Sequence, residues 1–287
     1  MMNTRMNKSH LNIGVYILQP YARTEQHIKD LADCGIDFVV CMDNDRPALD
    51  LFSKYGVGAV VTGVFPGWWG GNVETIGKLA EINPIEKYTD AMEKFEDHPA
   101  IWGVDVGDEP SGADLEHYGK IIHTVDHGLP EQFAYLNLHP HYAPPKPYLC
   151  VPSYADYIKL YCEKVPTDYI CYDFYPYDDN VPLSMDYENF RIVANACRDT
   201  GRSFWFVPQV NSRYEDRKMS ENTLRFQAYA AMAFGAENII WACYTAGWWF
   251  HNVLDKEGNK TEQYPLLQKI NREIHTLAEK YMEFRRA

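Results

Sequence analysis

The chain has 287 residues, of which 46% are hydrophobic and 23% charged, as in a globular protein. Its net charge of −13 argues against a nucleic-acid partner, because such a surface repels a phosphate backbone. No apolar run approaches the roughly 20 residues that span a bilayer, so we expect a soluble protein without a membrane partner.

The first ten residues carry some positive charge and read as a flexible N-terminus. The apolar stretch that follows, Leu11 to Leu18, is short and ends in Gln19-Pro20 without a small-residue cleavage site. We interpret this stretch as the first strand rather than a secretory leader, which favours a cytoplasmic location. A secreted chain that had lost its leader would read the same.

Short apolar runs then alternate with amphipathic stretches to the end of the chain, which is the pattern of βα units around a parallel sheet. Eight units fit the roughly 250 residues of a (β/α)8 barrel, an α/β fold of one domain, here 1–287. The expected strands are Gly14 to Leu18, Phe38 to Met42, Gly58 to Val64, Ile101 to Val106, Phe133 to Leu138, Tyr169 to Asp173, Phe204 to Pro208 and Asn238 to Cys243.

Helical patterns lie between these strands, and four of them are followed by a glycine that can adopt a left-handed C-cap. No linker or low-complexity segment divides the chain. The expected helices are Thr24 to Cys34, Pro47 to Tyr55, Pro84 to Phe95, Gly112 to His123, Tyr154 to Glu163, Met185 to Thr200, Glu221 to Phe234 and Gln263 to Glu283; the glycines are Gly35, Gly56, Gly201 and Gly235.

Two adjacent acids, Asp108 and Glu109, lie between Gly107 and Pro110 at the end of the fourth strand, where a barrel places its chemistry. Strand alternation predicts that Gly103, Asp105, Gly107 and Glu109 share one face, with Glu109 in the barrel mouth. Nearby aromatic walls are expected to raise the pKa of Glu109. Alternatively, both acids merely complement the dipole of the next helix, with Ser111 as its N-cap and Asp114 at N3.

With these features the chain resembles the (β/α)8 glycoside hydrolases, whose acid/base Glu ends the fourth strand, often within Asn-Glu-Pro. The resemblance covers the whole barrel, including Tyr175-Pro176 after the sixth strand and the segment from Phe226 to Trp241 near the C-terminus. It implies a carbohydrate substrate, no cofactor, no metal, and Glu109 as general acid.

The chain departs from the retaining members of that clan at the seventh strand, where Gln209 stands in place of the nucleophilic Glu. Two alternatives supply a second catalytic carboxyl group in place of that Glu. In one, Asp108 and Glu109 act like the Asp-Glu pair of hexosaminidase-like barrels, where the substrate's acetamido oxygen attacks. In the other, Asp173 at the end of the sixth strand is the partner, although it could equally be a structural cap. Asp43 and Glu215 are weaker candidates.

Substrate contacts are expected from the polar and aromatic residues of the loops that share this barrel face. One Trp of each adjacent pair is expected to face the core. The candidates are Trp68, Trp69, His139, His141, Tyr175, Gln209, Asn211, Tyr244 and Trp248.

Two further functions remain open at this point. Because Gln209 cannot act as a nucleophile, the barrel could bind carbohydrate without cleaving it. A metal-dependent hydrolase or isomerase could instead use His139, His141 and Asp173. The seven cysteines are odd in number and scattered without a CxxC pair, so they indicate neither a disulfide framework nor a thiolate metal site. The sequence leaves the oligomeric state open.

Overall fold

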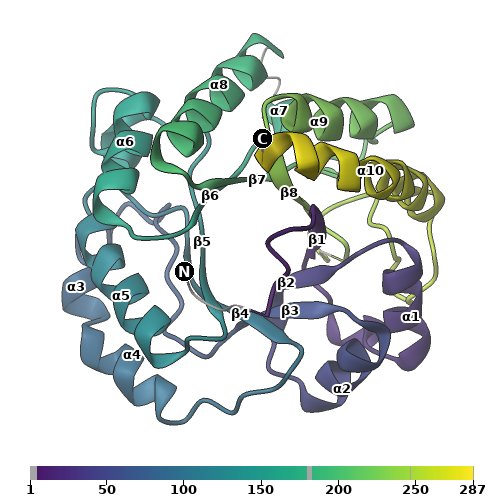
Figure 1. Ribbon diagram of the computed structural model, residues 1–287, viewed down its shortest axis with the longest axis horizontal. Coiled ribbons are helices and arrows are strands. Elements are labelled where there is room, and N and C mark those ends of the chain that lie inside the picture. The colour runs from purple at the N-terminus through teal and green to yellow at the C-terminus, as the bar shows by residue number, and fades with distance from the viewer. Residues whose placement is uncertain (1–4, 180–182, 246, 287) are drawn as a thin grey trace.

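The computed structural model describes residues 5–179, 183–245 and 247–286. Eight parallel strands form a single barrel sheet in the order β5-β4-β3-β2-β1-β8-β7-β6 (Figure 1), which confirms the predicted (β/α)8 architecture. The strands are β1 Asn12–Tyr16, β2 Phe38–Asp43, β3 Gly58–Thr62, β4 Ile101–Asp108, β5 Phe133–Asn137, β6 Tyr169–Asp173, β7 Ser203–Val207 and β8 Ala236–Trp241.

The barrel closes between β5 and β6 by an unusual contact. One bridge joins Leu138 to Tyr172, with the Leu138 N–H donating to the Cys171 carbonyl at 2.9 Å. Nearer the start of these strands, the Tyr169 hydroxyl accepts from the Leu136 N–H at 2.9 Å and donates to the Ala134 carbonyl at 2.8 Å. A side chain therefore satisfies the backbone groups that a continuous ladder would pair.

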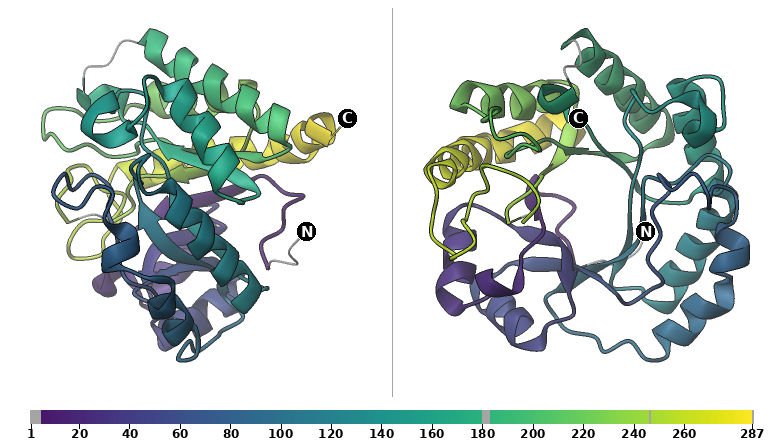
Figure 2. Two further views of the ribbon diagram at one scale, coloured as in Figure 1. Left: turned by 90° about the vertical axis from the view of Figure 1, so that its left-hand side faces the viewer. Right: turned by 180° about the vertical axis from the view of Figure 1, so that it is seen from behind.

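The helices form a ring outside the strands, which is visible from both ends of the barrel (Figures 1 and 2). In the described residues no helix is long and apolar enough to cross a membrane. The long helices match the predicted positions, and short helical segments join the loops. Their bounds are η1 Pro20–Ala22, α1 Glu25–Asp33, α2 Arg46–Tyr55, α3 Leu79–Ile82, α4 Ile85–Met92, α5 Leu115–Gly128, η2 Pro145–Leu149, α6 Tyr154–Lys164, α7 Pro176–Asp179, α8 Leu183–Thr200, α9 Glu221–Ala233 and α10 Gln263–Arg286.

Apolar side chains fill both sides of the barrel wall. The larger cluster lies between strands and helices, while a second cluster inside the barrel contains Phe38, Phe133, Tyr135 and Trp205. Because the strands are buried on both faces, they read in the sequence as continuous apolar runs rather than as alternation.

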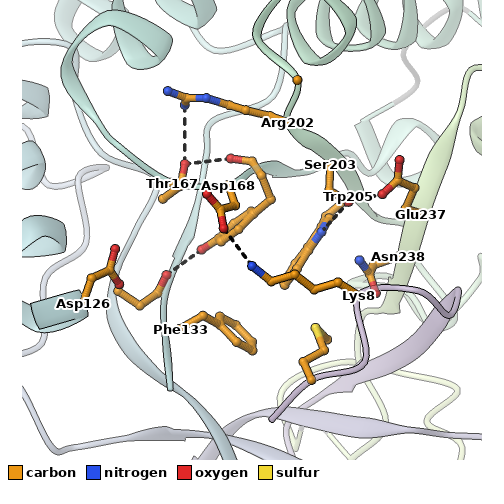
Figure 3. Close-up of a pocket in the computed structure, with 14 residues that line it drawn as sticks. Lys8, Asp126, Phe133, Thr167, Asp168, Arg202, Ser203, Trp205, Glu237 and Asn238 are labelled. Carbon is orange, nitrogen blue, oxygen red and sulfur yellow. Dashed lines mark hydrogen bonds and ion pairs between the residues drawn. The ribbon is translucent and has the colours of Figure 1, made fainter. Parts of the chain in front are cut away.

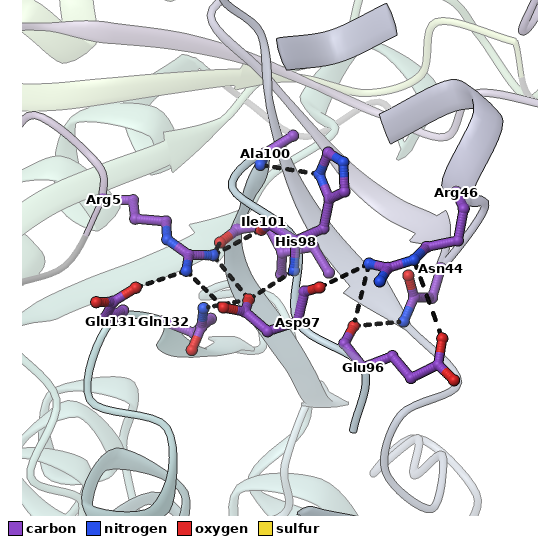
Figure 4. Close-up of polar contacts among 10 residues, drawn as sticks. All are labelled: Arg5, Asn44, Arg46, Glu96, Asp97, His98, Ala100, Ile101, Glu131 and Gln132. Atoms are coloured by element: carbon purple, nitrogen blue, oxygen red, sulfur yellow. Dashed lines mark hydrogen bonds and ion pairs between the residues drawn. The ribbon is translucent and has the colours of Figure 1, made fainter. Parts of the chain in front are cut away.

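The N-terminal segment packs beneath the barrel, at the end where the strands begin. Arg5 donates to Asp97 at 2.8 Å and to the Ile101 carbonyl at 3.0 Å, and it also pairs with Glu131 (Figure 4). Met6 is buried in the inner cluster. Residues 1–4 of the segment expected to be flexible lie outside the described residues.

A cavity of about 370 Å³ also lies at this end of the barrel (Figure 3). Its apolar lining includes Phe133, Tyr169 and Trp205, and the Trp205 ring stacks on Tyr169 with centroids 4.1 Å apart. The lining residues come from the N-terminal segment, from α5 and from the start of β5 to β8 with the residues just before these strands. This cavity is therefore at the opposite end of the barrel from Asp108 and Glu109.

Candidate active site

Irregularities in β4 decide how its acids are presented. The pairing of β4 shifts register against β3 and again, between Asp105 and Gly107, against β5. A Cβ on Gly107 would lie 2.1 Å from the Tyr118 hydroxyl on α5, whereas a Cβ on Gly103 would meet the Phe133 ring of the inner cluster. These two glycines therefore point to opposite sides of the wall. The predicted shared face was wrong, because bulges interrupt a strand's alternation.

Glu109 follows β4 directly and has a left-handed backbone, with φ of 45°. Its backbone N–H donates to the Asn137 carbonyl at 2.9 Å. Its side chain, 21% exposed, accepts from the Trp69 indole N–H at 2.8 Å and lies 3.7 Å from His139 Nδ1. A conformation that is rare outside glycine is thus held by neighbours on β5 and on the loop after β3.

Asp108 and Asp173 are joined by one amide group. Asn137 Nδ2 donates to Asp108 Oδ1 at 3.1 Å and to Asp173 Oδ1 at 2.9 Å. Since Asp108 ends β4, Asn137 ends β5 and Asp173 ends β6, three consecutive strands bring these groups together. Asp173 is 7% exposed as a residue, while Asp108 is exposed to solvent.

A line of polar groups inside the barrel orients the Asn137 amide. The Cys171 thiol donates to Asn137 Oδ1 at 3.6 Å, and the Tyr135 hydroxyl lies 3.4 Å from the same sulfur and contacts the Tyr16 hydroxyl. With its oxygen engaged below, the amide directs its NH2 group at the two aspartates. The sequence analysis missed Asn137, although its place at the end of a predicted strand was a usable signal.

The electrostatics separate the three acids. Burial raises the pKa of Glu109, but the His139 imidazole, the Trp69 N–H and the Arg213 guanidinium together outweigh burial, so that this pKa is lowered. The expectation of a raised value was therefore wrong. Burial and the charge of Glu109 raise the pKa of Asp173 to about 7, although Asn137 and Tyr175 partly offset them.

The pKa of Asp108 is raised well above its usual range, first by burial and then by the charges of Glu109 and Asp173. Asp108 is nevertheless exposed to solvent, so water moderates this rise in pKa. At neutral pH the site therefore combines an ionised Glu109 with an aspartate that holds a proton for part of the time.

The alternative role of Asp108 and Glu109 at the start of a helix does not match the structure. Helix α5 begins only at Leu115, beyond both acids. Ser111 and Asp114 bond to each other at 2.9 Å, and Asp114 accepts from the backbone N–H groups of Gly77 and Leu79. Asp114 thus anchors the long loop after β3.

The two Trp pairs divide as expected. Trp68 packs against the outer core, and its neighbour Trp69 is 56% exposed while it donates to Glu109. Trp248 is 64% exposed. Trp249 packs edge-on against Tyr175 with centroids 5.2 Å apart, next to Asp173. Ala246, in the same loop, lies outside the described residues.

Three residues expected to touch the substrate are wholly buried. Gln209, 0% exposed, accepts from the Tyr177 N–H and donates to the Asn211 carbonyl. Asn211 accepts from the Cys243 N–H at 2.7 Å, and Tyr244 lies in the outer core. The prediction was wrong for Gln209, Asn211 and Tyr244, because side chains with no exposed surface do not face the mouth.

His139 and His141 point in different directions. His139 faces Glu109, whereas the His141 ring lies against Tyr154 at 5.4 Å and its backbone N–H donates to Asn189. The structure does not bring the two histidines together as a chelating pair. Asp43 pairs with Arg23 at 2.9 Å, and the Glu215 carbonyl contacts His251.

The fold is similar to that of solved glycoside hydrolases. No family model and no curated protein matches the chain. An endo-β-1,4-mannanase from Thermotoga petrophila superposes with a TM-score of 0.66 at 8% identity, covering 95% of this chain and 78% of the mannanase. The Pseudomonas stutzeri endoglucanase Cel5A gives 0.61 at 15% identity, covering 91% and 92%.

A GH128 endo-β-1,3-glucanase from Sorangium cellulosum gives a TM-score of 0.57 at 13% identity, covering 90% of this chain and 98% of the glucanase. The chain therefore has the barrel fold found in several glycoside hydrolases, in agreement with the resemblance seen in its sequence. At these identities the likeness concerns the fold, and the three named enzymes act on different polysaccharides.

Proposed function

We propose that this protein is a glycoside hydrolase in which Glu109 and Asp173 are the two principal carboxyl groups and Asp108 is a third. The observation that carries the proposal is the gathering of these three acids at the C-terminal mouth of the barrel with their pKa values moved apart. Cleavage of a glycosidic bond needs one carboxylic acid and one carboxylate, and a barrel mouth is where such enzymes place them. The fold neighbours support the same reaction class.

The roles of the two groups can be assigned in two ways. In the first assignment, Glu109 at the end of β4 is the general acid, with Asp173 or Asp108 as the second carboxylate. In the second assignment the two roles are exchanged: Asp173 gives its proton to the leaving oxygen, and the ionised Glu109 attacks the anomeric carbon or activates water. The protonation states in the free protein favour this second assignment. In either assignment Asn137 holds Asp173 beside Asp108.

A substrate-assisted route uses the same residues. In this route the acetamido oxygen of the substrate attacks the anomeric carbon, Asp108 steadies the acetamido group, and Glu109 protonates the leaving oxygen. It applies only to N-acetylated sugars, so the choice of substrate distinguishes it from the other two.

The proposal is tested by product release from aryl glycosides and from mannan, cellulose and β-1,3-glucan, with N-acetylhexosaminides in the panel. We expect hydrolysis of at least one substrate and, where the leaving group is unactivated, its loss in Glu109→Gln. Hydrolysis confined to N-acetylated sugars would select the substrate-assisted route. Saturable sugar binding without turnover would contradict the proposal and favour a carbohydrate-binding barrel.

The leaving group separates the two role assignments. The leaving oxygen of an aryl glycoside with a strongly acidic phenol needs little protonation. Loss of the general acid therefore leaves cleavage of this substrate largely intact, whereas loss of the ionised partner abolishes it. If Asp173 is the acid, Asp173→Asn keeps activity on the activated glycoside and loses it on an unactivated one. The opposite pattern, in which Glu109→Gln keeps activity on the activated glycoside and loses it on the unactivated one, assigns the general acid to Glu109.

A further inference from the structure

Three side chains that could ligate a metal meet at the N-terminal end of the barrel, far from the carboxyl groups in sequence and in space. They are His10 ahead of β1, Asp37 between α1 and β2, and His275 on α10. One atom from each lies within 4.8 Å of the others. Among the described residues, no other group of at least three His, Cys, Asp or Glu side chains is close enough to share a single ion.

The distances are close to those of a metal site. Asp37 Oδ2 lies 3.6 Å from His275 Nε2 and 4.0 Å from His10 Nε2. Ligands about 2.1 Å from a tetrahedral zinc ion are roughly 3.4 Å apart, so the first pair needs a shift of a few tenths of an ångström. The side chain of His10 is 40% exposed and can rotate to close the longer distances.

Asp37 is already held in place by the backbone. Its Oδ2 accepts the Ile13 N–H at 2.7 Å, and a carboxylate oxygen retains a lone pair for an ion after accepting one hydrogen bond. The imidazole of His275 lies 3.0 Å from the Gly35 carbonyl, so an ion would compete with that single contact. The His10 and His275 rings are nearly parallel, 10° apart, with centroids separated by 5.4 Å.

We propose that His10, Asp37 and His275 bind a borderline divalent cation such as Zn²⁺, with water in the fourth position. Two imidazoles and one carboxylate are a donor set that zinc accepts, whereas Mg²⁺ and Ca²⁺ prefer oxygen ligands. Because the three ligands come from the N-terminal segment, the residue before β2 and α10, the ion connects segments that are far apart in the sequence. Its role is structural, and it is independent of the proposed reaction.

Calorimetric titration of the chelator-treated protein with Zn²⁺ tests this site. We expect one equivalent to bind at this site and the melting temperature to rise, since the ion binds only the native arrangement. His10→Ala and His275→Ala should each weaken that binding at least about tenfold. Melting of the variants without metal shows whether each still folds. The side chain of His10 is 40% exposed, so we expect His10→Ala to fold.

The chain supplies its own control. His123 and His127 are one turn apart on α5 with ring centroids 4.1 Å apart, and such a pair can also bind zinc. His123→Ala should leave the binding at His10, Asp37 and His275 unchanged, and all variants keep the seven cysteines. Loss of zinc binding in His123→Ala but not in His10→Ala would overturn the proposal, as would a parent protein that binds no Zn²⁺.

Discussion

Asn137 is the residue on which the arrangement of the two aspartates depends. Its amide lowers the pKa of both Asp108 and Asp173, so Asn137→Ala should raise both values and release the two side chains. We expect kcat/KM to fall about 10-fold to 100-fold, the loss of hydrogen bonds to charged groups. The alkaline limb of the pH profile should move to higher pH. Asn238→Ala, at the opposite end of the barrel, is the matched control.

The hydrogen bond from the Trp69 indole N–H to Glu109 can be tested by itself. Trp69→Phe keeps an aromatic ring and removes the N–H that donates to Glu109. The pKa of Glu109 should rise, because that hydrogen bond lowers it, and kcat/KM should fall about tenfold. Trp102→Phe makes the same change near the start of β4, at the other end of the strand from Glu109. Equal losses in both variants would contradict the role given to the Trp69 N–H.

The sequence predicted which residues lie at the C-terminal ends of the strands, but it did not predict where their side chains point. Asp108, Glu109 and Asp173 reach one mouth because the C-terminal ends of parallel strands must meet there. Gln209, Asn211 and Tyr244 occupy similar positions in the sequence, yet all three are buried. Hydrogen bonds to backbone groups hold Gln209 and Asn211 inward, and Tyr244 packs in the outer core. Nothing in the order of residues distinguishes these two outcomes.

At the scale of an element, β4 is the strand whose irregularity shapes the site. Gly107 has φ of 150° and faces the Tyr118 hydroxyl, so Gly107→Ala adds a methyl group where a Cβ would lie 2.1 Å from that oxygen. We expect destabilisation of roughly 2 to 5 kcal/mol by urea unfolding.

Gly63→Ala is the comparison for this prediction. Gly63 also has a positive φ, 77°, but a Cβ there meets nothing within 4 Å, so only the backbone term of about 1 to 2 kcal/mol applies. Similar losses of stability for the two variants would show that the contact with Tyr118 does not constrain β4.

Element positions were predictable because continuous apolar runs mark strands that are buried on both faces. The four glycines expected after helices all have positive φ, 78° at Gly35, 71° at Gly56 and Gly201, and 98° at Gly235. The bulges in β4 and the four-residue helices α3 and α7 were not predicted. The bulges change which side of the wall each residue of β4 faces, but the sequence does not mark where they fall. Four residues are too few to show a helical period.

At the scale of the whole molecule, buried acids should make stability depend on pH. Burial raises the pKa of Asp173 and of Asp126 to about 7 and that of Asp105 to about 6, from an ordinary 3.8. Each acid keeps its proton in the native state after the unfolded chain has lost it. The free energy of unfolding should therefore fall as the pH rises from about 4 to about 7, by at most about 1.4 kcal/mol per pH unit for each acid.

Urea unfolding at a series of pH values measures this dependence. Asp126→Asn removes one contribution at the end of the barrel remote from Glu109, so its curve should be flatter over the same range. A parent protein whose stability rises between pH 4 and pH 7 would contradict the burial of these acids in protonated form.

The central claim is that Glu109 takes part in glycosidic bond cleavage, and the ratio of kcat/KM between the parent and Glu109→Gln tests it most directly. The ratio should be measured on the best substrate of the panel that has an unactivated leaving group, with Glu131→Gln, beneath the barrel, as the control. We predict a loss of at least about 10²-fold to 10⁴-fold for Glu109→Gln and none for Glu131→Gln, with both variants folded. An unchanged rate in Glu109→Gln would contradict the account.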